Sequence, residues 1–229
     1  MIPAFAPHLT LEAGRDIAEV RGSTVLHGDF HVEVDRSALH HRRAAFCPGT
    51  WTQPDEVHGT TVLAVDYPGH HDFAPADAVV THCRGAVLAV WVGDCAPVVL
   101  VGADGAIGAA HAGWQGALDG VLQATVRAMG SAEITAILGP CIHPCCYEFG
   151  IDQLDEFVAR FGPGVAGTTT WGTPALDMPA VARAALSEVN VALDDRSQCT
   201  GCNDRQFYSH RRRGQRGRQV LTVQKRARA

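Results

Sequence analysis

Short apolar runs bounded by Gly, Pro or Asp recur through the middle of the chain. Valine and alanine dominate them, and several contain no polar position. Such runs are typical of strands that are buried on both faces. The strands predicted from this pattern cover residues 61–66, 77–82, 86–92, 98–101, 106–110, 133–138 and 219–224.

The pattern changes after residue 111, where apolar positions fall at helical spacing. This spacing predicts a helix over 115–129, and Gly130 then provides a stop signal. Two further helices are predicted over 152–161 and over 177–189, the latter with a proline in its first turn. The glycines of 162–172 indicate a flexible connection rather than a domain boundary. Strands and helices that alternate in this way predict one α/β domain with mixed sheets over residues 1–229.

The length and composition are those of a folded protein. A chain of 229 residues with 46% hydrophobic content can bury a sizeable core, which excludes the disordered and fibrous classes. The first ten residues lack a basic region followed by an apolar stretch, so no secretory signal is predicted. The longest apolar run, 86–92, is far below the roughly 20 residues of a spanning helix. We therefore expect a cytoplasmic protein without a membrane segment.

The charge is unevenly distributed. The net charge is −5, yet residues 211–229 contain eight of the 19 basic side chains and no acidic one. This tail lacks interleaved aromatic residues and any known nucleic-acid motif, so we expect no nucleic-acid partner. Lys225, Arg226 and Arg228 are interpreted as a solvated C-terminus. Arg211 and the arginines that follow it are a candidate anion site, because a guanidinium group presents a fork of donors to phosphate.

The eight cysteines are expected to be reduced, since the chain is of medium size and has no export signal. Cys145, Cys146, Cys199 and Cys202 would together supply the four thiols of a structural zinc site. The alternative is that they are buried or spectator cysteines.

Two histidines and one cysteine near predicted strand ends are the main candidates for chemistry. His58 precedes a strand, Cys95 follows one, and His111 stands where a strand gives way to a helix. Side chains at strand ends converge over one edge of a sheet, and two imidazoles with one thiol leave the fourth position of zinc open. Their spacing matches no short zinc motif, so surface histidines and a core cysteine remain the simpler interpretation. A cysteine nucleophile, Cys95, with His111 as its base would use the same residues without a metal.

Several motifs, in the same order along the chain, resemble the YfiH family, which is also called laccase-domain, multicopper polyphenol oxidase or purine nucleoside phosphorylase. The resemblance extends from about residue 50 to the C-terminus, and residues 1–50 have weaker support. The motifs are Val57-His58-Gly59, Asp77-Ala78-Val79-Val80-Thr81, Asp94-Cys95-Ala96-Pro97-Val98, His111-Ala112-Gly113-Trp114, Gly139-Pro140-Cys141-Ile142, Pro144-Cys145-Cys146-Tyr147-Glu148 and Phe207-Tyr208-Ser209-His210-Arg211-Arg212.

The resemblance implies a layered α/β/β/α fold with mixed sheets and makes His58, Cys95 and His111 the catalytic zinc ligands. It implies phosphorolysis of purine nucleosides (inosine, guanosine, adenosine and methylthioadenosine) to free base and ribose-1-phosphate, with adenosine deamination as a second reaction. The partners would then be purine nucleosides and inorganic phosphate, and Arg211 would bind substrate. The oligomeric state and the preferred nucleoside are not specified by the sequence.

Two alternatives to the phosphorylase remain. Family members have been described as copper-dependent polyphenol oxidases and as peptidoglycan editing factors, and copper would also bind a site of two histidines and a cysteine. A multicopper oxidase needs further copper sites, and neither His40-His41 nor His70-His71 forms an evident ligand pair. The second alternative is a non-enzymatic interaction module whose zinc ion only stabilises the fold.

The chain departs from the family pattern at Glu56, where a glutamine is usual, and at His143, where a glycine is usual. Glu56 would place an additional carboxylate near the metal. Only Asp35-Arg36 loosely matches an Asn-Arg pair of the family's N-terminal region. Asp94 is expected either to orient a metal ligand or to cap a strand.

Overall fold

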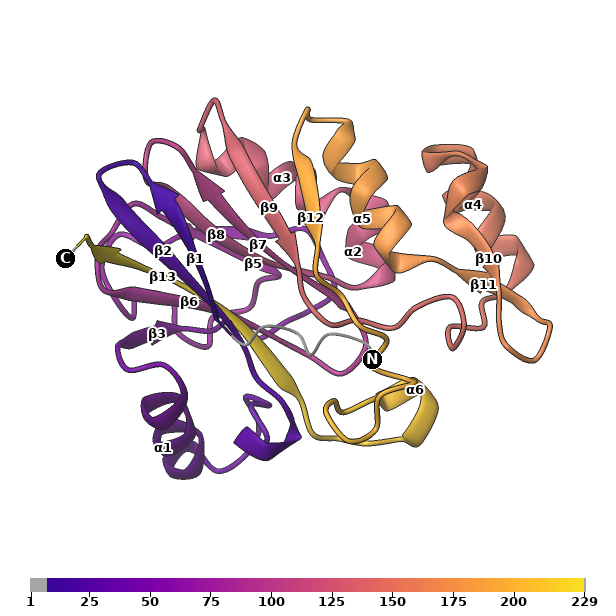
Figure 1. The fold of residues 1–229 in the computed structure, drawn as a ribbon, viewed down its shortest axis with the longest axis horizontal. Helices are drawn as coiled ribbons and strands as arrows, with labels where there is room; N and C mark the ends of the chain where they lie inside the picture. The colour runs from indigo at the N-terminus through magenta and orange to yellow at the C-terminus, as the bar shows by residue number, and fades with distance from the viewer. Residues whose placement is uncertain (1–7, 229) are drawn as a thin grey trace.

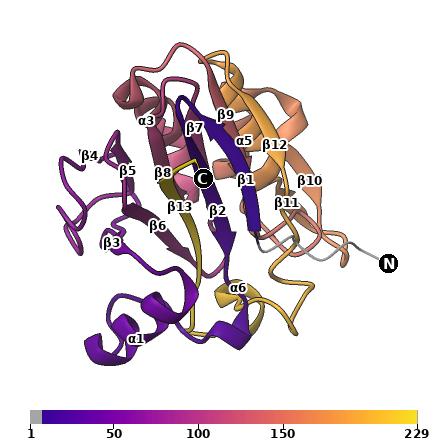
Figure 2. The ribbon, with the colours of Figure 1, turned by 60° about the vertical axis from the view of Figure 1, so that its left-hand side comes forward.

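The computed structural model describes residues 8–228, in which two β-sheets pack face to face between helices (Figures 1 and 2). The first sheet contains, in spatial order, β1 (His8–Ala13), β2 (Asp16–Gly22), β13 (Gln219–Ala227), β6 (Ala86–Val92) and β3 (Thr50–Thr52). Its neighbours are antiparallel except for β6 and β3, which are parallel.

The second sheet contains, in spatial order, β12 (Ala192–Asp195), β9 (Ile134–Leu138), β7 (Ala96–Gly102), β8 (Ile107–Ala112), β5 (Ala78–Thr81) and β4 (Val62–Ala64). The outer pairs β12–β9 and β5–β4 are parallel, and the inner pairs are antiparallel. Both sheets are therefore mixed, as the sequence predicted.

Helices cover the outer faces of the two sheets (Figure 2). The helices on the side of the second sheet are α2 (Trp114–Asp119), α3 (Val121–Met129), α4 (Ile151–Phe161) and α5 (Met178–Ser187). The first sheet is covered by α1 (Arg36–Phe46). The remaining elements are the 3₁₀ turns Val25–His27 and Pro163–Val165, the hairpin of β10 (Ala166–Thr168) and β11 (Pro174–Leu176), and the short helix α6 (His210–Arg213).

The alternation of side chains along the central strands explains the layers. In β6, Leu88 and Val90 pack between the sheets, whereas Val87 and Ala89 pack beneath α1. In β7, alternate residues likewise face the other sheet or the helices. An uninterrupted apolar run is therefore needed to fill both faces. The layered α/β/β/α fold predicted from the sequence is confirmed.

The predicted helix over 115–129 is wrong as a single element. It is divided into α2 and α3 at Gly120, whose φ of 97° belongs to the left-handed region. Gly120 donates its backbone N–H to the carbonyl of Gly116, which closes α2 before α3 begins. The apolar spacing continues across the break, so periodicity alone does not reveal it.

Other boundaries also differ from those predicted. The strand predicted over 106–110 continues to Ala112, so His111 lies inside β8 rather than after it. The strand predicted over 61–66 is reduced to β4. The connection over 162–172, expected to be flexible, contains a 3₁₀ turn and most of the β10–β11 hairpin. The weakly supported residues 1–50 contribute β1, β2 and α1.

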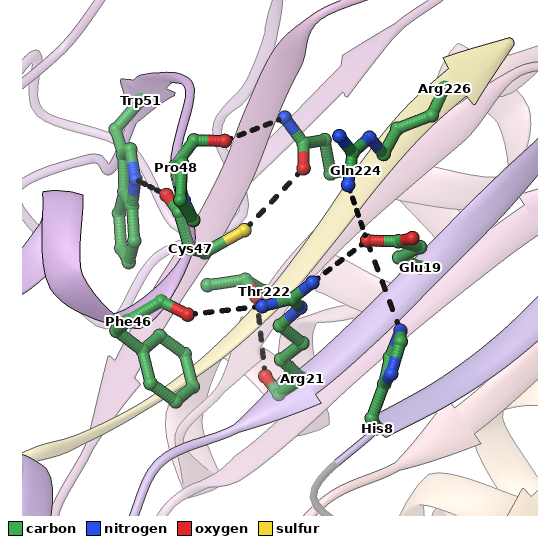
Figure 3. A network of polar contacts seen from close by, with 10 residues as sticks. All are labelled: His8, Glu19, Arg21, Phe46, Cys47, Pro48, Trp51, Thr222, Gln224 and Arg226. Carbon is green, nitrogen blue, oxygen red and sulfur yellow. Dashed lines mark hydrogen bonds and ion pairs between the residues drawn. The ribbon is translucent and has the colours of Figure 1, made fainter.

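Of the three basic residues interpreted as a solvated C-terminus, Lys225 is buried, which corrects that interpretation, whereas Arg226 and Arg228 are exposed. Lys225 is 6% exposed and donates from Nζ to the carbonyl of Gly105 at 2.8 Å. Arg226 pairs with Glu19, which also contacts Arg21 and His8 (Figure 3). Arg228 pairs with Glu12. Pairing of β13 with β2 places these cations beside the carboxylates of the first sheet, where their charges are compensated.

None of the helices within residues 8–228 combines the length and hydrophobicity of a membrane-spanning segment.

We expect Gly120→Ala to reduce the free energy of unfolding by about 1 kcal/mol, because an L-residue is strained at this left-handed position. Gly164→Ala is the matched control, since Gly164 has no positive φ and its added methyl group would point into open space. Urea denaturation of the two variants measures the difference. Equal stability of both variants would contradict the strained junction between α2 and α3.

Candidate metal centre

The structure brings together the three side chains that the sequence singled out, from three separate segments. His58 lies in the loop before β4, Cys95 in the turn between β6 and β7, and His111 in β8. Their ligand atoms all lie within 4.8 Å of one another. Cys95 Sγ is 4.0 Å from His58 Nε2, and the two imidazole rings are perpendicular with centroids 4.8 Å apart.

The register of the second sheet explains why these distant residues meet. In the β7–β8 pair, Pro97 is opposite His111, so Cys95 lies close to the same end of β8. In the β5–β8 pair, Ala78 is opposite Ala110, which places Asp77 beside His111 from the other side. The predicted convergence at strand ends is therefore a consequence of two antiparallel pairings.

Asp77 holds two of the three side chains in position. Its carboxylate accepts the backbone N–H groups of His58 at 2.8 Å and Gly59 at 2.7 Å, and it accepts from His111 Nδ1 at 2.9 Å. His58 has a φ of 60°, which costs an ordinary residue roughly 1 kcal/mol, and these backbone bonds offset that strain. Because Nδ1 of His111 is bonded to Asp77, Nε2 is the atom that remains for a metal.

The side chains around His111 favour positive charge on its ring. Burial would lower the pKa of His111, but the charges of Glu56 and Cys95 and the bond to Asp77 raise it well above its usual value. Burial disfavours the Cys95 thiolate, yet His111 and His58 lower the Cys95 pKa to about 6. A thiolate and two oriented imidazoles form a donor set that suits zinc or copper, so these residues fit a bound metal ion.

Glu56 lies beside the centre, as its departure from the family pattern suggested. Its Oε1 accepts the backbone N–H of Trp91 at 2.7 Å, and its Oε2 is 3.6 Å from His111 Nε2. Burial raises the pKa of Glu56 to about 8.

A pocket opens beside the three side chains, and two arginines also line it. Arg211 lines this pocket and stacks over the Tyr147 ring at 4.7 Å, with Nη1 donating to the carbonyl of Glu148 at 2.7 Å. Arg218 lines it as well and lies 6.0 Å from the Trp91 ring. The structure thus places the predicted anion-binding residue Arg211 and the candidate metal ligands on one cavity.

Asp94 neither orients a metal ligand nor caps a strand through its carboxylate. Its Oδ1 accepts the hydroxyl groups of Thr200 at 2.6 Å and Ser209 at 2.8 Å, and its Oδ2 accepts the backbone N–H of Arg211 at 2.7 Å. These bonds hold α6, and with it Arg211, against the turn that carries Cys95.

Sequence reasoning assigned no role to Asp77, although Asp77 belongs to one of the quoted motifs. The available signal was a lone carboxylate directly before a strand that is buried along its whole length. A fully buried charge in that place requires several donors, which here are two backbone N–H groups and an imidazole.

The chain is similar to known proteins in sequence. Residues 22–226 match the family described as multi-copper polyphenol oxidoreductase laccase. Purine nucleoside phosphorylase SCO2081 of Streptomyces coelicolor is 40% identical over 72% of this chain and 70% of its own length. Purine nucleoside phosphorylase YlmD of Geobacillus stearothermophilus is 31% identical over 86% of this chain and 82% of its own length.

The fold is also similar to a solved structure. The crystal structure of protein NMB0706 of Neisseria meningitidis superposes with a TM-score of 0.80 at 25% identity, covering 95% of this chain and 98% of that one. The family match covers nearly the whole described chain, and two purine nucleoside phosphorylases are related to it over most of their length. The chain therefore belongs to the laccase-like YfiH family, whose curated relatives include purine nucleoside phosphorylases.

Proposed function

We propose that the protein is a zinc-dependent purine nucleoside phosphorylase of the cytoplasm, with adenosine deamination as a side reaction. The relatives named purine nucleoside phosphorylase support the reaction class. The observation that carries the proposal is a single pocket whose lining includes both the three candidate ligands and two arginines, namely His58, Cys95, His111, Arg211 and Arg218.

In phosphorolysis, a phosphate oxygen forms a bond to C1′ of the ribose while the bond from C1′ to the purine nitrogen breaks. The purine leaves with the bonding electron pair and takes up a proton. Phosphate must be held with its charge compensated, and Arg211 and Arg218 offer charge-assisted hydrogen bonds from the pocket wall. The guanidinium group of Arg211 stacks on the ring of Tyr147, and its Nη1 donates a hydrogen bond to the carbonyl of Glu148.

His58, Cys95 and His111 would hold the metal, and Asp77 would fix His111 so that Nε2 is presented to it. A bound zinc ion would supply Lewis acidity to an oxygen of the substrates, with one coordination position left by the protein. In the deamination, water adds to C6 of adenine and ammonia leaves. The same open position suits both reactions.

The copper oxidase alternative is less favoured by the arrangement of ligands. Within residues 8–228, two groups of His, Cys and acidic side chains are close enough to share an ion. One is the centre described above and the other consists of four cysteines without a histidine. A multicopper oxidase requires several copper ions with imidazole ligands, which these two groups do not provide.

The decisive measurement is base release from a panel of purine nucleosides by metal-quantified protein. We expect phosphate-dependent formation of free base and ribose-1-phosphate, and ammonia from adenosine without phosphate. His111→Ala should lose at least 100-fold in kcat/KM and its metal at this centre. His58→Ala serves as a second variant, because His58 is exposed and its loss leaves the core intact. Base release that survives both substitutions would reject the metal-dependent mechanism, and phenol oxidation restricted to copper-loaded protein would favour the oxidase.

Arg211→Met should raise the KM for phosphate about tenfold to 100-fold, the equivalent of one charge-assisted hydrogen bond. The KM for the nucleoside should change less, because Arg211 is assigned to phosphate. Arg216→Met is the matched control, since Arg216 is exposed, lies on the same segment and does not line the pocket. Initial rates at varied phosphate concentration separate the two. An equal change for Arg211→Met and Arg216→Met would remove Arg211 from the phosphate site.

Asp77→Asn should weaken metal binding at the centre 10- to 100-fold, because the carboxylate that orients His111 and the His58 backbone is neutralised. Competition with a chromophoric chelator measures the affinity directly, without reference to turnover. Asp66→Asn is the control, since this carboxylate is largely exposed and remote from the three ligands. Unchanged affinity in Asp77→Asn would show that orientation by Asp77 contributes little.

A further inference from the structure

A second group of metal-ligating side chains lies outside the catalytic pocket and consists of four thiols from two loops. The loop before α4 carries Cys145 and Cys146, and the loop before α6 carries Cys199 and Cys202. All four sulfur atoms lie within 4.8 Å of one another. The sequence offered this set only as an alternative to spectator cysteines, and the fold brings its members together.

We propose that Cys145, Cys146, Cys199 and Cys202 bind a zinc ion in a closed, structural site. The proposal stands independently of the nucleoside chemistry, because the four thiols do not line the catalytic pocket.

The distances between the sulfur atoms match a tetrahedral metal site. Zinc lies about 2.3 Å from each thiolate in such sites, so the sulfurs at the corners are ~3.8 Å apart. In this protein, Cys145 Sγ lies 3.9 Å from Cys146 Sγ, 3.6 Å from Cys199 Sγ and 3.4 Å from Cys202 Sγ. Cys146 Sγ lies 3.3 Å from Cys202 Sγ. All these cysteines are free, with separations well beyond the ~2.05 Å of a disulfide bond.

The choice of zinc follows from the donor set. Four thiolates in tetrahedral contact are typical of zinc or of a single iron ion, whereas hard cations prefer oxygen. A four-iron cluster binds each cysteine to a different iron, which separates the sulfurs more widely than is seen here. Four protein ligands leave no position for a substrate, so the ion would stabilise structure rather than take part in the reaction.

The surrounding backbone is built for close approach of the two loops. Cys199 Sγ accepts the backbone N–H of His143 at 3.4 Å, which is the kind of contact that supports a thiolate ligand. A methyl group on Gly201 would lie 2.7 Å from Cys146 Cβ and 3.0 Å from Cys146 Sγ. Only glycine therefore lets the C-x-x-C loop approach the vicinal cysteines this closely. Cys202 is exposed, which leaves a path by which metal enters.

The site would hold the part of the catalytic pocket that contains Arg211. Tyr147, which stacks on Arg211, follows Cys146 directly. Thr200, whose hydroxyl group donates to Asp94, follows Cys199. Arg213 of α6 donates to the carbonyl groups of Thr200 and Gly201 at 3.0 Å each. A zinc ion that joins the two loops would thus fix Tyr147 and α6 relative to each other.

The test counts metal in protein purified with thiols kept reduced. In a His111→Ala background, which removes the first centre, we expect one zinc ion per chain, with sulfur-only coordination at about 2.3 Å by X-ray absorption. Cobalt substitution should give the intense charge-transfer absorption of a tetrathiolate site. Adding Cys202→Ser should abolish this absorption and remove the zinc. Cys83→Ser changes a partly buried cysteine that belongs to neither group of metal-ligating side chains. This control should retain the absorption and the zinc ion.

The outcomes are distinguishable from those of the phosphorylase proposal. Wild-type protein with one sulfur-only zinc and no nucleoside activity would reject the proposed function and uphold the second site. A His111→Ala protein that binds no metal would overturn the second site, whether its four thiols titrate as free or are found in disulfides. Iron in place of zinc would overturn the assignment of the metal. The metal count and the X-ray absorption of the His111→Ala protein use the intact cluster. Both therefore test the proposal even where Cys202→Ser fails to fold.

Discussion

The arrangement of the candidate catalytic centre depends on one buried carboxylate. Asp77 is fully buried at the start of β5 and compensates its charge with two backbone N–H groups of one loop and an imidazole of β8. These three bonds hold its pKa below the usual range, although burial alone would raise it. One carboxylate thereby joins a loop that has an unfavourable backbone conformation to a rigid sheet. The position of His58 and the tautomer of His111 are both set by that junction.

Hydrogen bonds to a second carboxylate join the catalytic centre to the cysteine cluster. Asp94 precedes Cys95 and binds Thr200, Ser209 and the backbone of Arg211. The C-x-x-C loop, the short helix α6 and the turn that carries Cys95 are therefore one connected unit. Such a connection would let the proposed zinc site act on Arg211, the proposed phosphate ligand, without contacting the substrate. Its effect would be on the placement of Arg211 rather than on the metal ligands.

The success of sequence reasoning varied with the range of the interactions involved. The strands of the core were predictable because burial on both faces leaves a local apolar signature, as in 86–92. The meeting of His58, Cys95 and His111 was expected mainly from the family resemblance, because their spacing matches no short zinc motif and His111 lies inside a strand rather than at its end. The break at Gly120 was not predictable, since α2 and α3 preserve the apolar spacing on either side. The pairing of β2 with β13 joins residues about 200 positions apart, so the burial of Lys225 leaves no local signal. The cysteine cluster likewise joins two loops across 54 residues.

The charges around His111 favour a metal centre over a cysteine nucleophile with an imidazole base. Cys95, His111 and Asp77 alone would resemble a nucleophile, a base and an orienting carboxylate. That arrangement does not require a second imidazole near the same sulfur, nor a buried carboxyl group beside Nε2, yet His58 and Glu56 occupy those positions. Burial would lower the pKa of His111, but Glu56, Cys95 and Asp77 around it raise that pKa well above its usual value. A divalent cation held by these side chains would compensate the negative charge of Cys95 and of the carboxylates around His111. This cluster of buried acidic groups therefore fits a dication better than a single proton shared by a thiol and an imidazole.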